Sequence, residues 1–121
     1  MVLLHGLGGD GSRWAPNIGR LSREFRVIAL DQIGFGQSDK PLANYHTGML
    51  AEFLARFLAA IGITKASLVG NSIGASVALY EAVHYPQPST GWCLPTVRAS
   101  EGKGPRRPRR PTPTSGTFRT A

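Results

Sequence analysis

The sequence has 121 residues, of which 41% are hydrophobic, enough for one modest globular domain with a real core. No apolar run reaches the roughly 18 residues needed to span a bilayer. The first residues, Met1 to Gly6, lack the positive region and the cleavage site of a signal peptide. We therefore expect a cytoplasmic protein with no membrane partner. The single cysteine, Cys93, excludes an internal disulfide and is expected to have no special role.

The net charge of +7 is unevenly distributed along the chain. Residues 1–86 hold seven Lys/Arg and six Asp/Glu, a net charge of +1, whereas residues 87–121 hold seven Lys/Arg and one acid, a net charge of +6. Six of the nine prolines also fall in residues 87–121. The sequence thus predicts a folded core over 1–86 and a basic, Pro/Arg-rich, disordered tail over 87–121. A shifted reading frame in GC-rich DNA would produce such a tail, so we expect it to be non-native.

Three short apolar runs predict the buried strands of a parallel sheet. Each run is followed by a glycine-containing loop or turn, as expected at the end of a strand. The predicted strands are Val2–Leu4, Arg26–Leu30 and Ala66–Val69.

Three helices are expected between and after these strands. Ser12 can cap a helix that runs to about Ser22. Apolar residues from Met49 to Ile61 recur at steps of three and four, which predicts a helix over Thr47 to Ala60 with Gly62 at its C-cap. A third helix runs from Ser72 to Tyr85, because Pro86 ends it.

Alternation of strands and helices favours βαβ units with right-handed crossovers in a parallel sheet. Three strands are few for such a sheet, and at least one edge would be a strand of central type without a neighbour. The sheet is therefore expected to be incomplete at both edges.

The sharpest motif is Gly70-Asn71-Ser72-Ile73-Gly74, a G-x-S-x-G between a predicted strand and a predicted helix. This is the context of a nucleophile elbow, in which a tight turn exposes the serine hydroxyl above the sheet edge. A Cβ at position 70 or 74 would clash in so tight a turn. Ser72 would also lie at a helix N-terminus, where partial positive charge stabilises an oxyanion. The alternative is a structural turn with an N-cap serine.

The second motif is His5-Gly6-Leu7-Gly8-Gly9, directly after the first strand. Glycines there expose backbone N–H groups, and an acyl-transfer site needs two such donors aimed at the tetrahedral oxygen. The backbone N–H groups of Leu7 and Ile73 are the natural pair. A phosphate-binding loop is disfavoured, because the spacing of G-x-G-x-x-G and a P-loop lysine are both missing.

The third motif, Asp31-x-x-Gly34-x-Gly36-x-Ser38, follows the second strand. Asp31 can accept hydrogen bonds from loop N–H groups and fix the turn. Because it precedes the nucleophile strand, it is not a candidate for the triad acid. We expect it to have a structural role.

Through these three motifs, residues 1 to about 86 resemble the α/β-hydrolase family, specifically its branch of esterases, meta-cleavage-product hydrolases and epoxide-hydrolase-like proteins. The resemblance implies a partial α/β-hydrolase fold with three layers around a mostly parallel sheet. It also implies an acyl-enzyme mechanism on a small-molecule ester or related carbonyl, with no cofactor and no metal. Ser72 would be the nucleophile, and serine at the elbow speaks against dehalogenase or true epoxide hydrolase chemistry. Support would come from His5, Gly6, Gly70, Asn71, Gly74 and Asp31.

The triad acid and histidine are missing from the sequence. In the family both follow the nucleophile, yet after Ser72 the acids are Glu81 and Glu101 and the only histidine is His84. Glu81 and His84 fall on the helix that begins at Ser72, roughly 13 to 18 Å away by helical rise. His46 opens the second helix and could lie on the surface, cap the helix or lie at a pocket rim, and we favour the surface. We therefore expect an N-terminal fragment of a longer hydrolase, with little turnover by itself.

Two other interpretations remain open. The chain could be a non-catalytic fragment or pseudoenzyme, or its basic tail could bind an anionic partner. The tail has little aromatic interleaving and no nucleic-acid motif, so we expect no nucleic-acid partner. The substrate and the oligomeric state are left open. The residues that could neutralise phosphates are Arg106, Arg107, Arg109 and Arg110.

Overall fold

The computed structural model describes residues 1–85 and 94–96 of the chain. These residues form a parallel sheet with the strand order β2-β1-β3-β4. The register pairs Leu4 with Leu30 on one side and with Gly70 on the other. The strands are β1 (Val2–Leu4), β2 (Ile28–Leu30), β3 (Leu68–Asn71) and β4 (Leu94–Thr96).

Three of these strands are the predicted ones, with shifted bounds. The predicted strand at 26–30 is regular only from Ile28, and the one at 66–69 runs over Leu68–Asn71. Strand β2 is limited to the three residues that pair with β1, whereas β3 also pairs with β4 and extends to Asn71, the partner of Thr96. The fourth strand, β4, falls in the part of the chain for which no regular structure was predicted. The remainder of that predicted disordered tail lies outside the described residues.

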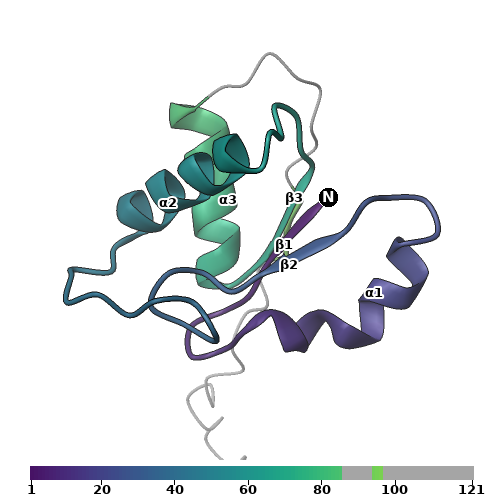
Figure 1. The fold of residues 1–121 in the computed structure, drawn as a ribbon, viewed down its shortest axis with the longest axis horizontal. Coiled ribbons are helices and arrows are strands. Elements are labelled where there is room, and N and C mark those ends of the chain that lie inside the picture. Colours follow the sequence, from purple (N-terminus) through teal and green to yellow (C-terminus); the bar gives the residue numbers. More distant parts are fainter. Residues whose placement is uncertain (86–93, 97–121) are drawn as a thin grey trace, which may run out of the picture.

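The elements form three layers, as expected (Figure 1). Helices α2 (Thr47–Ala60) and α3 (Ile73–His84) cover one face of the sheet and pack against each other. The other face carries the 3-10 helix η1 (Gly11–Trp14) and helix α1 (Ala15–Leu21), of which η1 contacts β1 and β2. The chain therefore has the partial α/β architecture that its sequence predicted.

The core lies between the sheet and the two helices on the first face. Alternate residues of a strand point to opposite faces, so Val2 and Leu4 enter this core while Leu3 faces the other side. All three side chains of β1 are buried, as expected for an inner strand of a parallel sheet. The other buried members of the core are Leu30, Leu50, Ala51, Leu54, Leu58, Leu68, Val77 and Ala78.

Helix α2 has the predicted bounds, Thr47–Ala60. Its predicted apolar stripe places Leu50, Leu54 and Leu58 in the core. Gly62 follows the helix with φ +70°, where its N–H donates to Ala59 and that of Ile63 donates to Leu58. These two bonds form a Schellman motif, which satisfies carbonyls that the helix end would otherwise leave free.

The first predicted helix differs from the structure. A single helix from Ser12 was expected, but the chain forms η1 and then α1, and Asp10 caps η1 by accepting from the N–H of Ser12 at 2.9 Å. Pro16 explains the break, because it has no N–H to donate to Ser12. The carbonyl of Ser12 is instead bonded by Ala15, which gives the tighter 3-10 geometry.

Candidate active site

Ser72 lies at the bend between β3 and α3, with φ 54° and ψ −118°. It is the one non-glycine residue with positive φ among those that the structure describes. Such a backbone conformation costs about 1–3 kcal/mol and persists only where the surrounding structure enforces it. Ser72 is exposed, and its side chain caps no helix N–H in the described part of the chain. Its hydroxyl is therefore presented at the surface of a strained turn.

Glycines make this bend possible by allowing backbones to touch. A Cβ on Gly70 would lie less than 3.0 Å from the backbone of Gly74 and Ala75. A Cβ on Gly74 would likewise lie less than 3.0 Å from the carbonyl oxygens of Leu4 and His5. Gly70 thus lets α3 begin against β3, and Gly74 lets α3 rest on the end of β1.

The loop after β1 reaches the same bend. A Cβ on Gly6 would lie 3.4 Å from the Cβ of Ser72 and 3.5 Å from the carbonyl oxygen of Asn71. Within the described residues, no hydrogen bond uses the backbone N–H of Leu7 or of Ile73. Ile73 opens α3, where a free N–H and the helix dipole both favour negative charge. The loop that carries Leu7 and the first residue of α3 therefore both adjoin the bend at Ser72.

His5 is buried, with 1% of its surface exposed, and both ring nitrogens are engaged. The backbone N–H of Gln32 donates to its Nε2 at 3.1 Å, and its Nδ1 lies 2.8 Å from the carbonyl oxygen of Gly6. An Nε2 that accepts carries no proton, so Nδ1 is the protonated nitrogen and donates to Gly6. His5 is therefore a fixed neutral side chain that holds the loop beside Ser72.

Sequence reasoning missed Gln32, which also is 1% exposed. Its side-chain Nε2 donates to the carbonyl oxygen of His5 at 2.9 Å, while its Oε1 has no partner within the described structure. The only signal in the sequence that could have indicated a role for Gln32 was its position directly after Asp31 in the loop. A buried amide in an irregular loop has no periodicity to reveal it.

Asp31 joins the two loops at this edge of the sheet. Its Oδ1 accepts from the N–H of Gly11 at 2.5 Å, and its Oδ2 accepts from the N–H of Gln37 at 2.7 Å. The hydroxyl of Ser38 donates to the backbone carbonyl oxygen of Asp31. Gly36 lies so close that a Cβ there would collide with the Asp31 carboxylate. Asp31 thus fixes the loop after β2 to the loop after β1.

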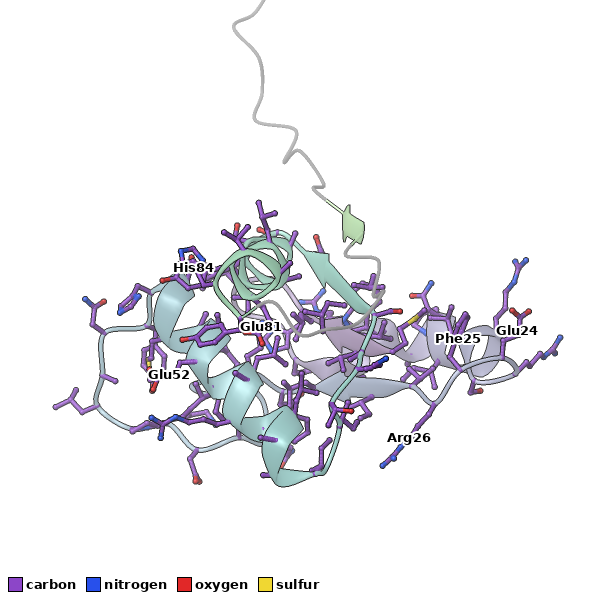
Figure 2. All side chains as sticks on the ribbon, turned by 90° about the horizontal axis from the view of Figure 1, so that it is seen from above. Glu24, Phe25, Arg26, Glu52, Glu81 and His84 are labelled. Atoms are coloured by element: carbon purple, nitrogen blue, oxygen red, sulfur yellow. The ribbon has the colours of Figure 1, made fainter. Side chains whose placement is uncertain are left out.

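The acid and the histidine that follow Ser72 on α3 lie far from the bend. Figure 2 shows Glu81 and His84 on different sides of α3. Glu81 is 4% exposed, its Oε2 has no partner in the described structure, and burial raises the pKa of its carboxyl to about 7. His84 is exposed, stacks on Tyr80 and lies 3.0 Å, through Nδ1, from the Tyr80 carbonyl oxygen.

The remaining histidine, His46, caps α2 rather than serving the site. It is exposed, as expected, and its Nδ1 accepts from the N–H of Met49 at 3.3 Å. Over residues 1–85 and 94–96, the histidines therefore offer no free imidazole near Ser72.

A metal site, a membrane-spanning helix and a binding cavity each require features that can be sought in the described residues. No group of three His, Cys, Asp or Glu in the described structure could hold a metal ion. No described helix is long and apolar enough to cross a membrane. A cavity of about 340 Å³ lies at the opposite end of β1 from the serine, lined by Met1, Val2, Arg26 and residues 62–66.

The comparison with known families identifies the family to which the chain belongs. A sequence model of the family described as "alpha/beta hydrolase fold" matches residues 1–89. The chain belongs to the α/β-hydrolase fold family. The strand, elbow and helix around Ser72 lie within the matched residues.

Individual relatives of this α/β-hydrolase chain are hydrolases of several kinds. The chain is 39% identical over 87 residues to a putative carbamate hydrolase, RutD, of Escherichia coli, covering 71% of this chain and 33% of RutD. It is similar to the crystal structure of E-2-(acetamidomethylene)succinate hydrolase, with a TM-score of 0.69, 36% identity and coverage of 72% and 32%. It is also similar to an esterase from a marine microorganism, with a TM-score of 0.67, 29% identity and coverage of 71% and 33%.

The chain spans about a quarter to a third of the length of the relatives it matches. The matched part carries the elbow and the loop after β1. The rest of each relative has no counterpart in the alignment with this chain.

Proposed function

We propose that Ser72 is the nucleophile of a serine hydrolase that acts on an ester or related carbonyl compound of small size. The observation that carries the proposal is the strained, exposed position of Ser72 at the start of α3, in contact with the loop at Gly6. The backbone N–H groups of Leu7 and Ile73, one on each of these elements, take part in no hydrogen bond within the described residues. Preorganised amide donors of this kind stabilise the oxyanion of a tetrahedral intermediate and contribute much of the rate in acyl transfer.

The reaction proceeds in two steps. The Ser72 Oγ attacks the carbonyl carbon, its proton passes to a base, and the two amides stabilise the oxyanion of the tetrahedral intermediate. The intermediate then collapses to the acyl-enzyme, and the alcohol or amine leaves with the proton that the base returns to it. Water then attacks the acyl-enzyme and releases the acid, which regenerates the hydroxyl. Names of the relatives support this chemistry, because carbamates, amides and esters all present a carbonyl to the nucleophile.

The base for this reaction does not come from the described residues. Both nitrogens of His5 are engaged, while Glu81 and His84 lie roughly 13 and 18 Å along α3 by helical rise. We propose that the acid and histidine of the triad belong to the part of the relatives that this chain does not span. The described part of the chain then supplies a nucleophile and an oxyanion hole but no general base.

Covalent labelling tests the role of Ser72 without requiring turnover. The purified chain is incubated with a fluorophosphonate at pH 9, and intact-mass and peptide mass spectrometry locate the adduct. We expect one adduct on Ser72, none in Ser72→Ala, and unchanged labelling in Ser76→Ala. Ser76 is the matched control because it is an exposed serine on the same helix. Labelling that survives in Ser72→Ala would overturn the proposal.

A further inference from the structure

We propose that Gln32 is a positioning residue that orients the backbone N–H of Leu7 through His5. The inference rests on the proposed function, because it assigns a purpose to the Leu7 amide as an oxyanion donor. It concerns a different residue, Gln32, which touches no reacting atom. Gln32 is connected to Gly6 by hydrogen bonds: two join Gln32 to His5, and one joins His5 to Gly6. These bonds would orient the Leu7 N–H.

The first step fixes the tautomer of His5. Because the Gln32 backbone N–H donates to Nε2, the ring must carry its proton on Nδ1. The ring of Phe35 packs edge-on against His5, with centroids 5.4 Å apart and planes at 72°. This contact restricts rotation of the ring, so that the Nδ1–H keeps one direction.

The second step transmits that direction to the Gly6–Leu7 peptide. The Nδ1–H of His5 donates to the carbonyl oxygen of Gly6 at 2.8 Å, and the N–H of Gly9 donates to the same oxygen at 3.0 Å. A trans peptide is planar, and its N–H points opposite to its C=O. Since the Gly6 carbonyl is held toward His5, the Leu7 N–H is directed away from the imidazole.

In the third step, the side chain of Gln32 holds the peptide between His5 and Gly6. Its Nε2 donates to the His5 carbonyl oxygen at 2.9 Å, so the peptides before and after Gly6 are both fixed. Gln32 and His5 are each 1% exposed, and water does not compete for these bonds.

The unpartnered Oε1 of Gln32 supports a functional reason for this residue. Burying an amide with an unsatisfied acceptor costs stability that an apolar side chain of the same size would avoid. A residue retained for packing alone would not need the Nε2 donor. Compared with an apolar side chain of the same size, an amide at position 32 adds the hydrogen bond from its Nε2 to the carbonyl oxygen of His5.

The test compares Gln32→Met with Gln37→Met in the 15N-labelled chain. Methionine keeps the length of glutamine but cannot donate to His5. Gln37 lies on the same loop, is exposed, and is bonded through its backbone N–H to Asp31, so its side chain serves as the control. The amide proton shifts of Leu7 and Ile73 are measured before and after Ser72 is labelled with the fluorophosphonate.

In the unsubstituted chain and in Gln37→Met, we expect both amides to move downfield on labelling, as donors to the phosphonyl oxygen do. In Gln32→Met, we expect Ile73 to move as before, Leu7 to move less than half as far, and labelling to be about tenfold slower. A Leu7 response in Gln32→Met equal to that of the unsubstituted chain would overturn the inference. Loss of labelling at Ser72 in every chain would instead contradict the proposed function.

The imidazole of His5 gives a second measurement that needs no substitution and no labelling. The ring 15N spectrum of the unsubstituted chain should show protonated Nδ1 and unprotonated Nε2 at pH 8. A spectrum with the proton on Nε2 overturns the inference, whether or not Ser72 reacts and whether or not Gln32→Met folds.

Discussion

Gly74 lies against the carbonyl oxygen of Leu4 so closely that a Cβ at this position would stand less than 3.0 Å from it. This contact joins the first turn of α3 to the end of β1, and it therefore sets the separation between the elbow and the loop that carries Leu7. Neither backbone can move without changing the sheet or the helix, since β1 pairs with strands on both sides.

Gly74→Ala should consequently destabilise the chain. Overpacking against backbone costs about 1–3 kcal/mol, because the surroundings must shift to admit the methyl group. Gly19→Ala is the matched control, since Gly19 is also helical but a methyl group added there would meet nothing within 4 Å. There we expect a gain of about 0.5–1 kcal/mol from helix propensity. Urea unfolding of both variants checks the difference, and an equal response would contradict it.

Ser72→Gly should stabilise the fold while removing the hydroxyl that we propose as the nucleophile. Glycine adopts positive φ without strain, so about 1 kcal/mol of backbone strain at this position should be relieved. Ser72→Ala is the control, because alanine removes the hydroxyl but keeps the Cβ and the strain. Thermal unfolding should place Ser72→Gly above both Ser72→Ala and the original chain. A Ser72→Gly variant no more stable than Ser72→Ala would show that the turn is not strained.

Asp31→Asn should loosen the contact between the loops after β1 and β2. Asparagine keeps one carbonyl oxygen, so one of the two charge-assisted bonds, to Gly11 or to Gln37, is lost, at a cost of about 1–3 kcal/mol. Asp39→Asn is the control on the same loop, where the residue is exposed and only its backbone carbonyl is seen to accept a bond. Hydrogen exchange at the amides of Gly11 and Gln37 should accelerate in Asp31→Asn alone. Protection equal to that of the original chain would contradict this prediction.

Stability should fall as the pH rises from about 4.5 to 7, through the buried carboxyl of Glu81. Burial raises the pKa of this group from 4.5 to about 7, so in this window the folded state keeps a proton that the unfolded state releases. The linked loss of stability is of the order of 3 kcal/mol over the whole window. In Glu81→Gln this contribution should vanish, whereas Glu52→Gln, at an exposed position on α2, should retain it. Denaturant midpoints measured from pH 4 to 8 test the difference between the two variants.

Hydrolysis of an activated aryl ester by this chain should be slow, because the histidines of residues 1–85 and 94–96 offer no free imidazole near Ser72. If hydroxide must deprotonate Ser72, the Ser72-dependent rate should rise about tenfold per pH unit from 6 to 9 without a plateau. A general base such as histidine would instead give a plateau above its pKa. Subtraction of the Ser72→Ala rate at each pH isolates the relevant signal. Rapid turnover with a plateau near neutral pH would show that the chain supplies its own base.

The sequence by itself determined the alternating order of β1, β2 and β3 with the helical segments that follow them, the bounds of α2 and the strand–turn–helix position of Ser72. These features are local: an apolar stripe with a C-cap glycine defines a helix, and glycines two residues before and after a serine allow a sharp turn. Local signals also placed the loops after β1 and β2 at the ends of their strands.

Only the tertiary structure decided the strand bounds, the break between η1 and α1, the bonds from Gln32 to His5 and the burial of Glu81. Each depends on partners distant in sequence: β1 limits β2 to three residues, β4 extends β3 to Asn71, and His5 meets Gln32 across 27 positions. Periodicity reports which face of an element is apolar, but it carries no information on which polar group in a loop finds a partner on another loop. Hydrogen bonds between loops are fixed by packing of the sheet beneath them, so the loop beside Ser72 is positioned by contacts that no local pattern encodes.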